Sequence, residues 1–175
     1  MIKSIFVYGI ISGTVVILGM LVGMAMAGGV GSEAVGYLIM VIALSVIFVG
    51  IKRHRDLERG GVIKFLPAFA MGLGIAAVAG LAYVVTWEIY LAATDYAFME
   101  QYIQASIEAK RASGVSPEDL QVYIASTEAM RQQYGNPLFR VPITFLEIFP
   151  VGLLIALISA ALLRNPRFLP HRPTV

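Results

Sequence analysis

The sequence contains no cysteine and few charged residues. Without cysteine, disulfides, thiolate metal sites and cysteine nucleophiles are excluded. Charged residues make up only 14% of the chain and hydrophobic residues 58%, whereas soluble domains have about 25% and 45–50%. His54 and His171 lie in separate segments, too few and too isolated for a metal site. No serine-hydrolase, zinc-protease or nucleotide-binding motif is present, so we expect no enzyme, no metal and no cofactor.

Four long apolar runs occupy residues 5–27, 35–51, 65–92 and 141–163. A helix that crosses a bilayer needs about 20 apolar residues, and each run approaches or exceeds that length. The runs predict an all-α polytopic membrane protein with four transmembrane helices, forming a single integral domain over residues 1–175. The lipid bilayer is therefore its expected environment. The small net charge of +2 gives no indication of nucleic-acid binding.

Basic residues gather in the segment between the second and third runs. Five of the 13 lysines and arginines lie there: Lys52, Arg53, Arg55, Arg59 and Lys64. Basic residues in short loops stay on the cytoplasmic side, and the remaining bases near the chain ends agree with that side: Lys3, Arg164, Arg167 and Arg172. We expect both termini and the 52–64 turn to be cytoplasmic, with 28–34 and 93–140 outside. The turn could also bind anionic lipid headgroups, although setting topology is the interpretation we favour.

The N-terminus has one alternative interpretation. Lys3, the following apolar run and Ala25-Met26-Ala27 before Gly28 imitate a cleavable signal peptide. The apolar stretch 5–24 is longer than the usual 7–15-residue signal core. It also carries glycines at helix-packing spacing. An uncleaved membrane span is the better explanation.

Small residues recur at four-residue spacing in three of the runs. They are Gly9 and Gly13, Gly19 and Gly23, then Ala68, Gly72, Ala76 and Gly80, and finally Gly152, Ala156 and Ala160. Because lipid is as apolar as leucine, membrane helices associate by close backbone packing, which small residues permit. Such faces could form a dimer or pack within one chain. Their presence in three runs favours packing inside the bundle.

Segment 93–140 is the only sizeable part outside the runs, and its pattern predicts a helical hairpin. Tyr96, Met99, Tyr102, Ile103 and Ser106 recur at helical spacing, so we expect the third span to continue past the membrane surface until Ser113-Gly114. Ser116-Pro117-Glu118-Asp119 is a typical helix start. The second leg has one face made of Leu120, Tyr123, Ile124, Thr127, Met130 and Tyr134, and Asn136-Pro137 ends it.

Glu88 and Glu147 are the two acids inside the apolar runs. Both fall near the outer edge of the hydrocarbon. Asp95 lies seven residues after Glu88, and Arg140 lies seven residues before Glu147, so each pair shares a helix face. The four could form one network. If the two glutamates were close, one would hold a proton or a cation. Alternatively each acid is hydrogen-bonded at the interface and clamps the third and fourth spans together, which we favour. Pro150 should kink the helix beside Glu147.

Two blocks of residues resemble a known family. The first comprises 50–56 (GIKRHRD) and 60–65 (GGVIKF), and the second comprises 136–140 (NPLFR) and 144–152 (TFLEIFPVG). Together they resemble the bacterial membrane-protein family of unknown function described as domain of unknown function 4199. The resemblance covers nearly the whole chain. It implies a multi-pass protein of the bacterial cytoplasmic (inner) membrane with four spans, and no established activity.

The sequence leaves two functional hypotheses. The leading one is a non-enzymatic structural or accessory membrane protein, which packs as a homo-oligomer or beside a larger membrane partner through the external hairpin. The alternative is a small proton- or cation-coupled transporter that uses Glu88 and Glu147. A transporter needs a polar path across the membrane, and the first two spans offer only Ser12, Thr14 and Ser45.

Overall fold

The computed structural model describes residues 1–27 and 33–170, which fold into helices without any strand. The helices are α1 (Ile2–Ala27), α2 (Glu33–Leu44), α3 (Val46–Glu58), α4 (Phe65–Ala93), α5 (Ala97–Ala112), α6 (Pro117–Tyr134) and α7 (Pro137–Leu163). The all-α prediction is confirmed. Most of the predicted 28–34 link, and the tail residues His171 and Arg172, lie outside the described residues, as do the side chains of Ala25–Ala27.

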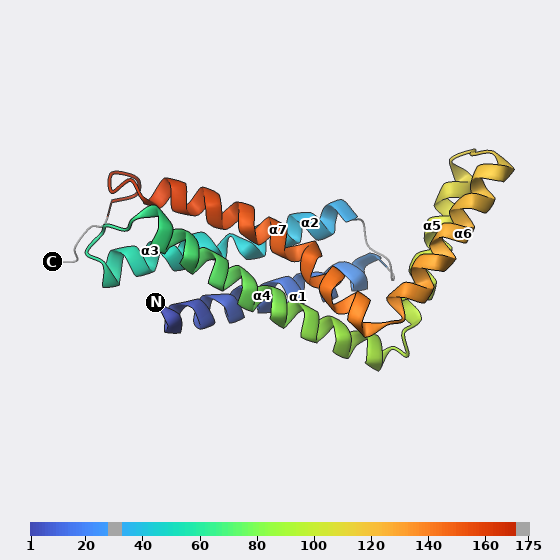
Figure 1. Ribbon diagram of the computed structural model, residues 1–175, viewed down its shortest axis with the longest axis horizontal. Coiled ribbons are helices and arrows are strands. Elements are labelled where there is room, and N and C mark those ends of the chain that lie inside the picture. Colours follow the sequence, from blue (N-terminus) through green and yellow to red (C-terminus); the bar gives the residue numbers. More distant parts are fainter. Residues whose placement is uncertain (28–32, 171–175) are drawn as a thin grey trace.

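Four long helical segments form a bundle in which α4 is central. It packs against α1 on one side and α7 on the other, while α2 and α3 contact both α1 and α7. Figure 1 shows α1 and α4 running in one direction and the α2–α3 segment and α7 running in the other. The segments long and apolar enough to cross a membrane are Ile2–Gly23, Ala34–Glu58, Phe65–Ala93 and Pro137–Leu163. The structure thus has four helical segments long and apolar enough to cross a membrane among the described residues, as the sequence predicted.

The outer surface of the bundle is apolar. Ile10, Leu81 and Leu154, from three different helices, are 56%, 58% and 58% exposed. Many further leucine, isoleucine and valine side chains on all four segments are exposed in the same way. Soluble monomers rarely present apolar patches of this extent. Lipid suits this surface better than water does, in agreement with the four segments of membrane-spanning length.

Small residues bring α4 into close contact with both neighbours. A Cβ added at Gly9 of α1 would lie 2.5 Å from Val78 Cβ, and one added at Gly72 would lie 2.7 Å from Ala156 Cβ of α7. Both distances are shorter than real carbon–carbon contacts, so the glycines are needed where the backbones approach. The small-residue faces therefore pack inside the bundle, as favoured from the sequence.

The second span is longer than the apolar run indicated. Its helix breaks only briefly at Ser45 and then continues to Glu58, so residues 52–58 are helical and the connection to α4 is 59–64. The prediction of a turn over 52–64 was wrong in its first half, because the polar residues there continue the helix rather than end it. Gly60 and Gly61, with φ of 61° and 84°, make the actual turn.

The third span does not run on into the next helix, contrary to expectation. The chain turns after Ala93, where the amide of Tyr96 donates to Leu91 O at 2.8 Å and that of Asp95 to Ala92 O at 3.4 Å. This six-to-one bond with a left-handed residue is the Schellman ending of a helix. Asp95 and Tyr96 have φ of 49° and 59°. The residues after the turn are helical, as their spacing predicted. The end of α4 was missed because the left-handed residues there are Asp95 and Tyr96 and not a glycine.

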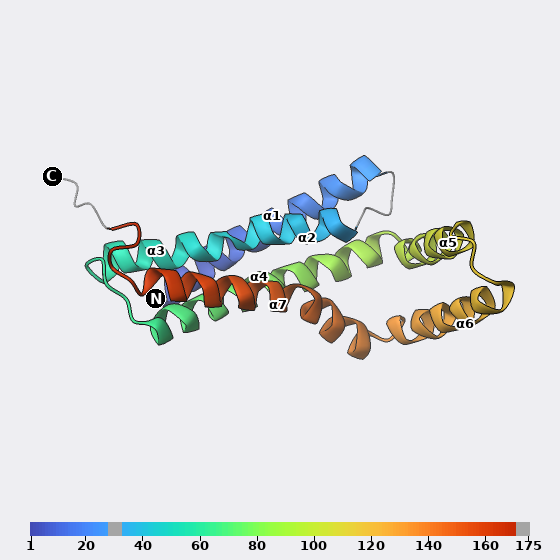
Figure 2. The same cartoon turned by 90° about the horizontal axis from the view of Figure 1, so that it is seen from above.

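Helices α5 and α6 form a pair that lies beyond the bundle (Figure 2). They pack on one another, with Ile103 and Thr127 buried between them. The predicted cap of α6 is present, since Ser116 Oγ accepts a hydrogen bond from the Asp119 amide at 3.1 Å. Both described chain ends and the α3–α4 connection lie at the other end of the bundle (Figure 1). Helix α7, which contains Pro142 and Pro150, bends along its length (Figure 2).

The packing predicts that Gly72→Ala destabilises the bundle. The new methyl group would lie 2.7 Å from Ala156 Cβ and 3.2 Å from its Cα, so α4 and α7 must move apart. Overpacking of this kind costs about 1–3 kcal/mol, measurable as a loss of unfolding free energy in detergent. Gly36→Ala is the matched control, because no atom lies within 4 Å of the added methyl. An equal loss in both variants would contradict this account of the α4–α7 contact.

Candidate functional site

Arg140 and Glu88 form a two-pronged ion pair between α7 and α4. Arg140 Nε donates to Glu88 Oε1 at 2.7 Å, and Nη2 donates to Oε2 at 2.6 Å. The Arg140 side chain is 2% exposed and that of Glu88 is 28% exposed. A guanidinium fork that meets both carboxylate oxygens is the strongest geometry for such a pair. The structure thus brings together two of the four residues of the predicted network.

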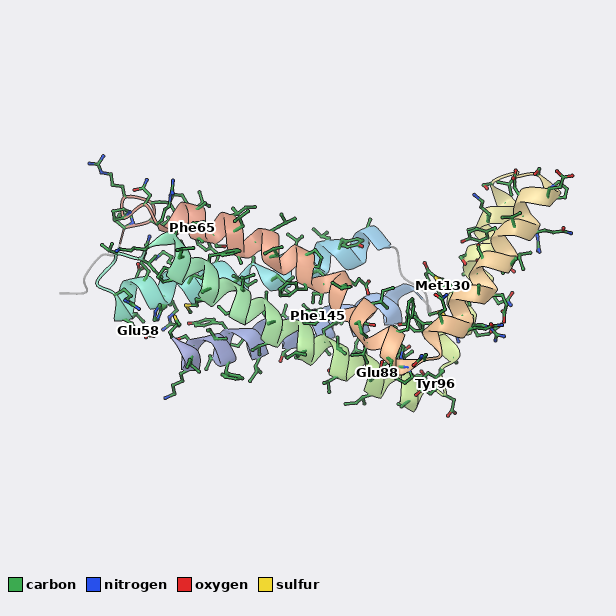
Figure 3. The ribbon with its side chains drawn as sticks, in the orientation of Figure 1. Glu58, Phe65, Glu88, Tyr96, Met130 and Phe145 are labelled. Carbon is green, nitrogen blue, oxygen red and sulfur yellow. The ribbon has the colours of Figure 1, made fainter. Side chains whose placement is uncertain are left out.

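Tyrosines enclose the Arg140 guanidinium. Its Nη1 donates to Tyr134 O at 3.0 Å, and its central carbon lies 5.3 Å from the Tyr96 ring centre and 5.8 Å from that of Tyr134. Aromatic faces attract a cation at these distances. Figure 3 shows Glu88 and Tyr96 together where α4 ends. The left-handed turn after α4 is what directs Tyr96 to this position.

A hydrogen bond between Trp87 and Tyr134 extends the cluster. Trp87 Nε1 donates to the Tyr134 hydroxyl at 2.7 Å, and Thr144 is a second hydrogen-bond partner of that hydroxyl. Burial raises the pKa of Tyr134, and the Trp87 and Thr144 hydrogen bonds oppose the rise only in part. The hydroxyl therefore stays protonated at neutral pH. It joins α4, the last residue of α6 and α7 at one point.

The other two predicted network residues lie apart from this pair. Asp95 is exposed in the turn after α4 and, within the described part of the chain, forms no ion pair with Arg140. Glu147 is exposed on α7, and its charge acts on the hydroxyls of Tyr83 and Tyr134. The carboxylate of Glu88 faces a guanidinium. The geometry therefore supports the clamp interpretation, in which Arg140 satisfies the acid, over a proton shared between two glutamates.

A depression of about 360 Å³ lies beside the clamp, between the helix pair and the bundle. Its walls include Leu91, Tyr96, Met99, Tyr134 and Arg140. Volumes of this size can hold small ligands, but here the Arg140 fork is already occupied by Glu88. The depression marks where the α5–α6 pair joins the membrane part of the molecule.

A second buried arginine, Arg55, lies at the opposite end of the bundle. Its side chain is fully buried, its Nε donates to Asp56 Oδ1 at 2.7 Å, and its two terminal nitrogens donate to Phe168 O at 2.9 Å and Leu169 O at 2.6 Å. The carbonyls at and beyond a helix C-terminus have no helical partners. Arg55 supplies donors to them and so fastens the segment after α7 to α3.

The basic segment identified from the sequence therefore divides in two. Arg55 is buried, and Lys52 is bound to Asp56 with Nζ 2.5 Å from Oδ2, so these two bases serve internal contacts. Arg53, Arg59 and Lys64 are exposed. Only the exposed three suit the expected contact with headgroups. Burial of Arg55 left no signal in the sequence, since its partners are backbone carbonyls far along the chain.

His54 is buried at the same end of the bundle. It is 4% exposed, with Nδ1 2.9 Å from Glu58 Oε2. Neither ring nitrogen has a well-oriented hydrogen bond to a described residue. Glu58 also accepts from Ser4 Oγ at 3.1 Å, which ties the start of α1 to the end of α3. No group of three or more potential metal ligands occurs among the described residues.

The clamp predicts that Glu88→Gln is strongly destabilising. It leaves the Arg140 charge buried without a carboxylate, and breaking a buried pair costs on the order of 3 kcal/mol. The measurement is the unfolding free energy in mild detergent. Glu108→Gln is the control, because Glu108 is exposed on α5 outside the membrane-length segments, and we expect a loss of less than about 1 kcal/mol. The double variant Glu88→Leu/Arg140→Met should lose less than the two single changes together. Equal losses for the two glutamine variants would refute the clamp.

The second arginine predicts that Arg55→Gln releases the segment after α7. The carbonyls of Phe168 and Leu169 would then accept hydrogen bonds from water instead of Arg55. Trypsin should cleave after Arg164 and Arg167 at least several-fold faster than in the unchanged protein. Exposed Arg53 provides the control variant Arg53→Gln, which should leave the cleavage rate unaltered. Cleavage at the same rate in all three proteins would show that Arg55 does not hold this segment.

A comparison with protein-family models agrees with this architecture. The model described as Protein of unknown function (DUF4199) matches residues 7–165. This range includes both buried arginines, most of the segment Ile2–Gly23 and all of the other three membrane-length segments of the described residues. The searches of curated proteins and of solved structures gave no match. Since the family model covers nearly the whole chain, the protein belongs to the family of unknown function DUF4199.

Proposed function

We propose that the protein is a structural or accessory component of a cytoplasmic membrane, which holds the α5–α6 pair outside the membrane as a contact surface for another protein. Both described chain ends and the 59–64 connection would then be cytoplasmic. The exposed bases Arg53, Arg59 and Lys64 support this orientation.

The observation that carries the proposal is the clamp at the base of the α5–α6 pair. Arg140 and Glu88 join α7 to α4, and the Trp87–Tyr134 hydrogen bond joins α4 to the end of α6. Bidentate and aromatic contacts of this kind limit rotation of the pair against the bundle. Rigid presentation lowers the entropy lost when a partner binds. A contact surface gains from this rigidity.

Self-association would have to use surfaces other than the small-residue faces. Gly9, Gly13, Gly72 and Gly152 already contact other helices of the same chain. A homo-oligomer would therefore form through the α5–α6 pair or through the outer sides of the spans. We favour the α5–α6 pair as the contact surface, whether the partner is a second copy of this chain or a different membrane protein.

Transport remains the second candidate because of Glu147. It is an exposed carboxylate on an apolar helix, three residues before Pro150. Such acids often carry protons or cations. Glu88 no longer supports that role, since its oxygens bind Arg140. The accessory function accounts for more of the polar contacts.

The absence of native cysteine permits one experiment on orientation and partner together. Gln104→Cys places a thiol on an exposed site of α5, and Arg59→Cys places one on the exposed α3–α4 connection. Intact cells are treated with a membrane-impermeant maleimide that carries a photoreactive group, then illuminated. We expect position 104 to be labelled and to crosslink in a defined ratio to one protein, and position 59 to stay unlabelled.

Two results would contradict the proposal. Labelling of position 59 but not 104 would reverse the orientation. Labelling of 104 without any protein crosslink, together with cation or proton flux in proteoliposomes that is lost in Glu147→Gln, would replace the accessory function by transport.

A further inference from the structure

Six exposed bases surround the end of the bundle where the described chain ends lie. We call this set the basic collar; it consists of Lys3, Arg53, Arg59, Lys64, Arg164 and Arg167. The residues come from four segments: the start of α1, α3, the connection to α4, and the end of α7. The Ser4–Glu58 hydrogen bond and the Arg55 bonds to Phe168 and Leu169 hold these segments together. The collar is thus a property of the fold, not of one stretch of sequence.

Acids at this end do not neutralise the collar. Asp56 is bound by Arg55 and Lys52, and Glu58 accepts from Ser4 and lies against His54. Among the described residues, none of the six collar bases has a side-chain nitrogen within 4.0 Å of a carboxylate oxygen. Positive charge therefore remains available for an external anion.

Exposed apolar side chains are interleaved with the collar bases. Leu57, Val62 and Leu66 are 67%, 57% and 73% exposed and alternate in sequence with Arg59 and Lys64. In a loop surrounded by water this exposure would be unfavourable. Side chains of both kinds suit the boundary between headgroups and acyl chains, where apolar groups insert and bases meet phosphates. A soluble anion would use the bases and leave the leucines in water.

We propose that the basic collar binds the headgroups of anionic phospholipids, with Leu57, Val62 and Leu66 against the adjoining acyl chains. The inference depends on the bundle lying in a bilayer, but not on the accessory role or on any protein partner. The bound lipids would brace the segments that meet at this end. The protein would then be more stable in an anionic membrane than in a neutral one.

Lipid titration of the purified full-length protein tests the collar. The protein in neutral detergent receives phosphatidylglycerol, phosphatidylcholine or inorganic phosphate, and bound lipid is counted by native mass spectrometry while thermal unfolding is followed. We expect phosphatidylglycerol alone to bind in a defined number and to raise the unfolding temperature. About 1 M salt should weaken the effect, because the screening length is then about 3 Å.

Two double variants with the same change of charge make the test specific. Arg53→Gln/Arg59→Gln removes two collar bases and should weaken phosphatidylglycerol binding roughly 10- to 30-fold. Lys110→Gln/Arg111→Gln removes two bases from the far end of α5 and should leave binding unchanged. Arg53, Arg59 and Arg111 are exposed and Lys110 is partly exposed, so we expect both variants to fold, which the unfolding measurement checks. Equal binding by phosphatidylcholine, an equal effect of inorganic phosphate, or equal loss in both variants would overturn the proposal.

Discussion

Close contact along α4 is the constraint on which the rest of the structure depends. Lipid offers little hydrophobic advantage to helix association, so the bundle must gain its stability from backbones that approach closely. Gly72 and Gly152 allow this against α7, and Gly9 and Gly13 allow it against α1. The register set by these contacts places Glu88 opposite Arg140. The polar clamp is therefore a consequence of how the apolar helices pack.

A buried arginine lies at each end of the bundle, and the two side chains have different hydrogen-bond partners. Arg140 meets a carboxylate across a helix interface and lies near two tyrosine rings. Arg55 meets its neighbour Asp56 and two carbonyls beyond α7. Buried charges contribute less to stability than to selecting one arrangement, because alternatives leave them unpaired. Both arginines thus help to specify how distant segments meet.

Local signals in the sequence were sufficient for much of the fold. Continuous apolar runs located the spans, and Ser116 and Asn136-Pro137 marked the ends of α6. Spacing along the helices grouped Glu88, Asp95, Arg140 and Glu147 as one possible network, of which the structure joins Glu88 and Arg140. What the sequence could not show depended on distant backbone. The break after α4 has no glycine. Arg55 was indistinguishable from its exposed neighbours, because the carbonyls that it binds belong to the segment after α7.

The separation between Arg55 and its partners has a consequence for biosynthesis. The carbonyl groups that receive its guanidinium belong to residues 113 and 114 positions later in the chain. When α3 first enters the membrane those groups have not yet been translated, so the cation must remain hydrated at the surface while the later helices insert. The contacts that close this end can therefore form only after the segment beyond α7 has been made.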